Sequence, residues 1–370
     1  MARILNTVFA CCLALAAAHG VKAQAGAPAP EKEPASNHAP APAPRQEDSG
    51  KLARWFELQT ATLMARYLSA ENSSGARTMN RLQHNMAFKG RIKFDPRGNY
   101  SLNAGLFSGN RFVVSWNNSG VGDHARGATN LYLKQLYFSA KPAAGLELQY
   151  GGLYLLRGES TEITSYDNDG YVVGQRVTLR RPKQLFFDEV SVTYGYLGDL
   201  TSPNINRRWH RLRQSNYHQF LVSKNVGRRA AVSADYTFQA GVETTRQAVK
   251  FNARGLRVVD SLRFEIYQRA DVKPAYGLAV AGEKTLFKRL SLNGGYADID
   301  PHYGGLNADR FGTGKRLFLF GTFVIKPEFS VSTYLTQGTG NNFAVANHRR
   351  FEVLFSYNLS SGLRKAGLFR

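Results

Sequence analysis

The sequence contains only two cysteines, Cys11 and Cys12, and both lie near the N-terminus. If the segment that carries them is removed on export, the mature chain can form neither a disulfide nor a cysteine-ligated metal site. The eight histidines are scattered without the spacing of metal ligands. Long apolar runs are also missing, although a membrane-spanning helix needs about 20 apolar residues. These absences argue against a disulfide scaffold, a metal centre and a helical membrane protein.

Catalytic motifs are equally scarce. The sequence has no Gly-x-Ser-x-Gly nucleophile elbow and no Ser/His/Asn set that would mark a lipase. Asp123 and His124 are adjacent, and neighbouring side chains on a strand point to opposite faces. The run Asp-Asn-Asp-Gly at 167–170 lacks the bidentate Glu of a full calcium loop, which leaves at most a loosely bound calcium ion. The sequence therefore predicts no enzyme, no metal site and no cofactor.

The first 50 residues carry two segments outside any folded core. Arg3 supplies a positive charge, Val8 to Ala18 is a short apolar run, and small residues at 21–23 or 23–25 offer a cleavage site. This order is typical of a secretory signal peptide, which we place at residues 1–25. Residues 26–50 are rich in Ala and Pro, which predicts a semi-extended periplasmic linker. The remaining domain is then 51–370.

The stretch from Arg81 to Ser108 shows the pattern that dominates the rest of the chain. Its residues alternate between an apolar parity and a polar parity, which predicts strands with one apolar and one wet face. The apolar parity holds Leu82, Met86, Phe88, Ile92 and Phe94, and the polar parity holds Gln83, Asn85, Lys89, Arg91 and Lys93. Residues 95–99 contain Pro and Gly and predict a turn. The first strand exceeds the ~5–6 residues of ordinary strands and reaches the ~9–11 needed to cross a bilayer.

An exported chain of long amphipathic strands without helices points to a closed barrel, because only helices and closed barrels satisfy every backbone group inside a bilayer. The chain has 18 Tyr and 23 Phe, which could form aromatic girdles at the two membrane interfaces. We predict an all-β fold, a transmembrane antiparallel up-and-down β-barrel. A secreted soluble β protein would also alternate, but it would not need strands of this length.

We expect sixteen strands, or fourteen if a weak pair such as 245–254 with 258–270 is misread. The expected strands are 52–68, 79–94, 99–118, 129–140, 145–157, 171–180, 185–198, 213–224, 229–241, 245–254, 258–270, 274–284, 289–300, 315–325, 328–338 and 347–359. Short turns alternate with longer loops, the usual asymmetry of such barrels. Strand 129–140 alternates poorly: Lys134 and Gln135 are adjacent, so one must face the apolar side unless a bulge intervenes.

The formal charge is +21, and all of the excess lies within residues 51–370. A lipid-facing Arg or Lys at the midplane costs about 2–4 kcal/mol, so this charge must lie in the lumen, in loops or at the interface. Nucleic-acid binding is not expected of an exported chain, although the field would attract anions. The basic residues predicted to face the lumen are Lys89, Arg91, Lys93, Arg246, Lys250, Arg254, Arg263 and Arg269.

With these strands the chain resembles the outer-membrane porins, specifically the sixteen-stranded ones, over about residues 51–360. The resemblance is one of pattern and implies passive diffusion of small hydrophilic solutes across the outer membrane of a Gram-negative bacterium. It further implies contact with outer-membrane lipid, including lipopolysaccharide, and a homotrimer as one candidate assembly. One departure is that such barrels usually end on an aromatic residue, whereas Phe369 is penultimate here and the last strand stops near Leu359.

The resemblance also implies that the third outer loop, here 158–170, folds into the lumen and narrows it. This loop carries Glu159, Glu162, Asp167 and Asp169. An acidic loop opposite a basic wall would create a transverse field, and clusters of Arg and Lys favour anions. Our leading hypothesis is therefore an anion-preferring porin. The same charges could instead be an ordinary solvated lining without selectivity.

A second basic cluster surrounds Trp209 in the connection that follows strand 185–198. It consists of Arg207, Arg208, Arg211 and Arg213. Because Arg binds phosphate through two parallel hydrogen bonds, the cluster could be an anion funnel or a lipopolysaccharide contact, or simply an exposed, solvated loop. Two other functions stay open at this level: a barrel hydrolase that uses loop residues, and a closed barrel for adhesion or cell-wall attachment through residues 26–50.

Overall fold

The computed structural model describes residues 55–365 apart from 113, 162–170, 181–185, 198–201, 212–213, 240, 254–257, 271–274, 301–313 and 340–347. The chain divides into two units, Met1–Pro40 and Ala41–Arg370, and every described residue belongs to the second. The predicted signal peptide and linker, at 1–25 and 26–50, lie outside the described residues. Among the helices that are described, none is long and apolar enough to cross a membrane.

Nearly all regular structure is strand. The strands are β1 (Phe56–Glu71), β2 (Arg77–Lys93), β3 (Tyr100–Phe107), β4 (Asn117–Gly122), β5 (Tyr132–Ala143), β6 (Leu146–Tyr154), β7 (Tyr171–Arg180), β8 (Glu189–Tyr196), β9 (Tyr217–Val226), β10 (Ala230–Gln239), β11 (Val242–Asn252), β12 (Ser261–Arg269), β13 (Ala275–Leu286), β14 (Leu290–Ile299), β15 (Gly314–Lys326), β16 (Phe329–Gly338) and β17 (Arg349–Asn358). A short 3-10 helix, η1 (Ile205–Arg211), precedes β9, and a helix, α3 (Leu359–Lys365), follows β17.

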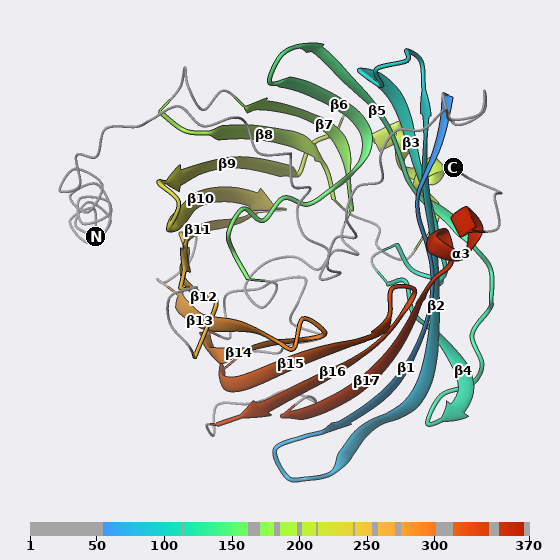
Figure 1. Ribbon diagram of the computed structural model, residues 1–370, viewed down its shortest axis with the longest axis vertical. Helices are drawn as coiled ribbons and strands as arrows, with labels where there is room; N and C mark the ends of the chain where they lie inside the picture. The colour runs from blue at the N-terminus through green and yellow to red at the C-terminus, as the bar shows by residue number, and fades with distance from the viewer. Residues whose placement is uncertain are drawn as a thin grey trace. The chain divides into compact units, whose positions relative to one another are not determined.

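These strands form one closed antiparallel barrel (Figure 1). The sheet closes because β1 pairs with β2 on one side and with β17 on the other. β3 and β4 both pair with β2, along different parts of its length, so they occupy a single position in the wall. The barrel therefore has sixteen positions, which confirms the predicted sixteen-strand antiparallel architecture and excludes the fourteen-strand alternative.

The prediction of one continuous strand over 99–118 was wrong. β3 ends at Phe107 and the chain leaves the sheet before β4 begins. Gly109 has a φ of 90°, and a Cβ there would lie 2.0 Å from the Val114 carbonyl oxygen, so only Gly allows this turn. Trp116, at the end of the excursion, covers the Arg66 guanidinium at 4.1 Å. We call the excursion, residues 108–116, the inner insertion, because Arg66 is on the inward face of β1.

Strand register sorts the side chains into two sets. Residues that lie opposite each other on neighbouring strands point to the same face of the sheet. The pairing can be followed from strand to strand, so one parity of residues faces inward around the whole barrel. The other parity carries large apolar side chains exposed at the surface, including Leu63, Tyr67, Ile92, Phe94, Val192, Phe220, Phe264, Ile266, Leu319, Phe323, Ile325, Leu335 and Phe355. Inward neighbours are mainly Ser, Thr, Asn, Gln and charged residues, but on β12 to β16 the inward parity also carries a buried cluster that includes Tyr267, Phe318 and Tyr334. A surface this apolar is the outer belt that a barrel presents to lipid.

A bulge resolves the adjacent Lys134 and Gln135 of β5. Gln135 pairs with Gly105, but the next pair joins Leu133 to Leu106, so Lys134 is left out of the ladder. Both side chains are consequently buried, and neither faces lipid. Lys134 Nζ donates to the carbonyl oxygens of Arg111 and Val114, at 2.8 and 2.6 Å. The bulge thus places a charged anchor against the backbone of the inner insertion.

Candidate functional site: the inner wall of the barrel

The register places seven of the eight basic residues predicted to face the lumen on inward positions. They are Lys89, Arg91, Lys93, Arg246, Lys250, Arg263 and Arg269, on β2, β11 and β12. The eighth, Arg254, lies outside the described residues. Five of the seven have carboxylate partners that the strand pattern does not reveal, so the wall is a set of ion-pair groups rather than a row of isolated cations.

Two of these groups have the same composition, one carboxylate shared by two cations. Glu57 on β1 accepts hydrogen bonds from Arg91 Nη2, at 2.8 Å, and forms an ion pair with Lys93 at 2.9 Å. Glu283 on β13 lies 3.5 Å from Lys250 and 3.7 Å from Arg263. Each group keeps one net positive charge, because a single carboxylate neutralises only one of the two cations.

A third group of this kind is buried and was missed by the sequence analysis. Glu352 on β17 accepts from Arg66 Nη1 at 3.0 Å and from Arg350 Nε at 2.6 Å. Arg66 also donates to Gln83 through Nε, at 3.1 Å. Arg66 and Arg350 lie on the expected polar parity of their strands, so the pattern could have found them. Arg66 lies 286 positions from Glu352 along the chain, and this separation hid the sharing of the carboxylate.

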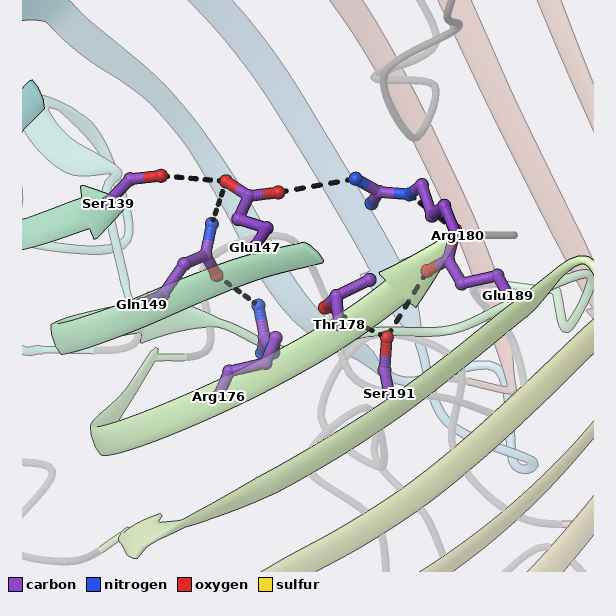
Figure 2. A network of polar contacts seen from close by, with 8 residues as sticks. All are labelled: Ser139, Glu147, Gln149, Arg176, Thr178, Arg180, Glu189 and Ser191. Atoms are coloured by element: carbon purple, nitrogen blue, oxygen red, sulfur yellow. Dashed lines mark hydrogen bonds and ion pairs between the residues drawn. The ribbon is translucent and has the colours of Figure 1, made fainter. Parts of the chain in front are cut away.

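On the wall formed by β5 to β8, two arginines and two glutamates form one network, so cations are not in excess (Figure 2). Arg180 donates to two carboxylates, Glu189 at 2.8 Å and Glu147 at 3.2 Å. Arg176, on the same face of the same strand, donates to Gln149 Oε1 at 3.3 Å. Ser139 in turn donates to Glu147 at 2.8 Å. This continuous polar network lines one side of the lumen and carries no excess of cations around Arg180.

The chain that follows β6 lies against inward-facing side chains of β9, β10 and β12. Gln219 Nε2 donates to the Leu156 carbonyl at 2.8 Å, and Glu159 N–H donates to Ser233 Oγ at 2.9 Å. Thr161 donates to Glu265 Oε2 through both its N–H, at 2.7 Å, and its hydroxyl, at 3.0 Å. We call residues 155–161 the docked segment.

The docked segment is the first part of the connection predicted to enter the lumen. Of the four acidic residues predicted there, Glu159 is described and makes its contact through the backbone. Glu162, Asp167 and Asp169 lie outside the described residues. The residues that hold the segment, Ser233 and Glu265 among them, are polar wall residues that the sequence analysis did not single out.

The inner insertion and η1 pack against each other. Phe112 joins a buried apolar cluster with Ile205, Phe107 and Val173. The Arg208 guanidinium stacks on the Phe112 ring at 3.7 Å. Arg208 is 2% exposed, so it acts as a packing residue there and is not accessible to solvent.

The predicted outer basic cluster is therefore divided. Arg207 is exposed, whereas Arg208 is buried. Arg211 lies 5.7 Å from the Tyr196 ring and donates to Gln214 Oε1 at 2.8 Å. Arg213 lies outside the described residues.

Asp123 and His124 lie just beyond β4, and their side chains meet. The prediction that the two side chains point apart was based on a strand at this position, and it was wrong. The chain bends at these residues, and His124 Nδ1 lies 2.7 Å from Asp123 Oδ1. Desolvation raises the pKa of Asp123, but hydrogen bonds from Asn80 N–H and His124 and the charge of Arg81 bring that pKa below its ordinary value. No group of three or more potential metal ligands occurs among the described His, Cys, Asp and Glu residues.

Comparison with known proteins supports the architecture from an independent direction. No protein-family model matches the chain, and no curated protein matches it. Among solved structures, Salmonella typhi OmpF in complex with daunomycin is similar with a TM-score of 0.55 and 11% sequence identity, over 83% of this chain and 98% of that one. A mutant of Rh. blastica porin is similar with a TM-score of 0.52 and 11% identity, over 82% of this chain and 99% of that one. The chain thus has the fold of the sixteen-stranded porins, a transmembrane antiparallel β-barrel.

Proposed function

We propose that this protein is an outer-membrane porin that lets small hydrophilic solutes diffuse passively and prefers anions. The observation that carries the proposal is the division of the wall into an apolar outer face and a polar, charged inner face in one continuous register. A soluble barrel would have no use for an outer belt of exposed Leu, Ile, Val, Phe and Tyr. The porin fold of the structural neighbours, OmpF among them, agrees with this assignment.

The shared carboxylates support an anion preference. Around Glu57, Glu283 and Glu352, two cations face one carboxylate, so each group attracts anions and repels cations at the wall. The pair of acids around Arg180 works in the opposite sense. Basic side chains that line a pore favour anions through the same Coulomb attraction.

The docked segment supports a narrowed passage. Its contacts to inward residues of three strands hold backbone on the lumen side of the wall, where it occupies cross-section. The acidic residues that follow it would complete the transverse field that the resemblance implies. Permeation then needs no covalent chemistry, because selection would come from size and charge.

Reconstitution in planar bilayers tests the proposal. In a tenfold KCl gradient, the sign of the reversal potential should show that chloride permeates more readily than potassium. Arg91→Gln with Lys93→Gln should move that potential toward the cation side, whereas Lys315→Gln, on the outward parity, should leave it unchanged. A cation-selective wild-type channel would end the anion assignment, and absence of any conductance would end the porin assignment.

The remaining parts of the proposal concern targeting and lipid contact. We propose that residues 1–25 are a signal peptide and that 26–50 are a periplasmic linker. Arg207 is exposed and Arg211 half-buried on η1, which suits them for contacts with lipopolysaccharide phosphate. N-terminal sequencing of the protein from outer-membrane fractions would test both the cleavage site and the location.

A further inference from the structure

The turn between β13 and β14 has an unfavourable backbone. It closes through a hydrogen bond from Arg289 N–H to the Leu286 carbonyl, at 3.2 Å. Its two central residues, Phe287 and Lys288, have φ values of 52° and 58°, and they are the two non-Gly residues with positive φ in the described part of the chain. A bulky side chain at positive φ is strained, and such strain persists where the surrounding structure or a function maintains it.

A second hairpin of the same barrel shows how strain is avoided at the first loop position. β9 and β10 end in the same register, with Val226 opposite Ala230 as Leu286 is opposite Leu290. In that hairpin the first loop residue is Gly227, with a φ of 62°. Glycine adopts this conformation at no steric cost. Phe287 occupies the corresponding position, so its aromatic side chain is present where glycine would stabilise the turn.

The Phe287 side chain is barely packed against the rest of the protein. It is 90% exposed, more than any other large hydrophobic residue described. Lys288 and Arg289 beside it are also exposed. The next outward residue, Leu290, pairs with Phe323, and Phe323 and Ile325 are exposed members of the apolar belt. The turn therefore continues the lipid-facing surface at its edge, with two cations where the belt ends.

We propose that Phe287, Lys288 and Arg289 form a binding site for the headgroup of an anionic phospholipid in the leaflet on the short-turn side of the barrel. The inference rests on the membrane placement under the proposed function. The ring would lie at the boundary between headgroups and acyl chains, where aromatic side chains are favoured. The ammonium and guanidinium groups would then reach the lipid phosphate, and an anionic headgroup adds attraction that a zwitterionic one lacks.

The test uses the full-length protein reconstituted in vesicles of phosphatidylcholine alone or with phosphatidylglycerol, and in uncharged detergent. Apparent affinity for phosphatidylglycerol is measured by titration, and the midpoint of heat unfolding by the gel shift between folded and unfolded barrel. Lys288→Gln with Arg289→Gln should lower the affinity about fivefold for each cation removed, the factor expected for one basic residue at an anionic surface. Arg228→Gln with Arg229→Gln, in the matched hairpin, is the control and should lower it less.

Phe287→Gly distinguishes the contribution of Phe287 to lipid binding from its effect on the stability of the turn. It should raise the unfolding midpoint in detergent, because it removes the strain at position 287, and yet lose the extra stabilisation by phosphatidylglycerol. If phosphatidylglycerol stabilises Phe287→Gly and the double Gln variant as much as the wild type, the inference is wrong. It is also wrong if Phe287→Gly lowers the midpoint in detergent, since the ring would then be packing within the protein. Conductance is recorded in parallel: a non-conducting barrel that keeps its preference for phosphatidylglycerol contradicts the porin assignment alone.

Discussion

Replacing Glu265 by Ala should loosen the docked segment without opening the barrel. Glu265 projects inward from β12 and receives two hydrogen bonds from Thr161, one from the backbone N–H and one from the hydroxyl. The substitution removes Oε2, the one carboxylate oxygen that accepts both hydrogen bonds. The other attachments of the segment, to Ser233 and Gln219, remain. We therefore expect the Thr161 end of the segment to leave the wall while the Leu156 end stays in place.

The size of the effect follows from the burial of the carboxylate. Glu265 is 1% exposed, so water does not screen its hydrogen bonds. Each hydrogen bond to a charged group contributes about 1.5–3 kcal/mol. Removing the carboxylate also removes the cost of burying it, which offsets part of the loss. A net change of about 2–3 kcal/mol shifts the ratio of docked to released segment by roughly 30- to 160-fold.

Single-channel recording is the assay. A released segment should produce rapid current fluctuations and a changed mean conductance, and liposome swelling should extend to larger sugars. Glu265→Gln, which retains an acceptor oxygen, should lie between the wild type and Glu265→Ala. Ser332→Ala, an inward residue that bonds Thr322 at 2.9 Å, removes a wall hydrogen bond away from the docked segment and serves as the control. A Glu265→Ala channel with wild-type conductance, noise and size limit would refute the constricting role of residues 155–161.

Three other substitutions and one titration test separate parts of the structure. Glu283→Gln should strengthen the anion preference, seen as a larger chloride reversal potential, because its two cations lose their shared carboxylate. Lys134→Met should lower the free energy of unfolding by about 2–4 kcal/mol, measured by urea unfolding in detergent, because it removes the buried ammonium group that donates to the Arg111 and Val114 carbonyls. Gly277→Ala should lower the melting midpoint, since the new Cβ would lie 1.6 Å from the Tyr267 ring. The lowered pKa of Asp123 stabilises the folded β2–β4 contact when the pH is above the ordinary aspartate pKa. This stabilisation should disappear as the pH falls through the pKa that Asp123 has in the folded protein, and hydrogen exchange of the amides at the β2–β4 contact can follow the loss.

The sequence was informative about the wall because a period of two is a local property. The alternation around Phe88 and Lys89 fixes which side chains face lipid and which face inward, and every expected strand has a counterpart in the barrel. The single strand expected at 99–118 is the exception. A left-handed turn at Gly109 and an anchor from Lys134, on a different strand, divide it, and an anchor on another strand leaves no mark on the local pattern.

The partners of the inward charges could not be predicted for a related reason. Arg66 and Glu352 lie 286 positions apart, and they meet because the barrel closes between β1 and β17. Arg208 appeared to belong to an exposed basic cluster, but its place beneath Phe112 depends on how η1 packs against the inner insertion. Parity states the direction of a side chain, whereas its partner depends on register and closure.

The sharing of one carboxylate by two cations is nevertheless the expected result of composition and membrane placement together. The chain has 48 Lys and Arg residues but 27 Asp and Glu residues. Most of the Lys and Arg side chains must be kept off the outward face, because each lipid-facing cation costs about 2–4 kcal/mol near the midplane. Cations crowded onto the inward face repel one another unless carboxylates separate them, and nearly two cations are available for each carboxylate. An arrangement such as that of Lys250, Glu283 and Arg263 limits the repulsion and still leaves that part of the wall with one net positive charge, in agreement with the anion preference that we propose.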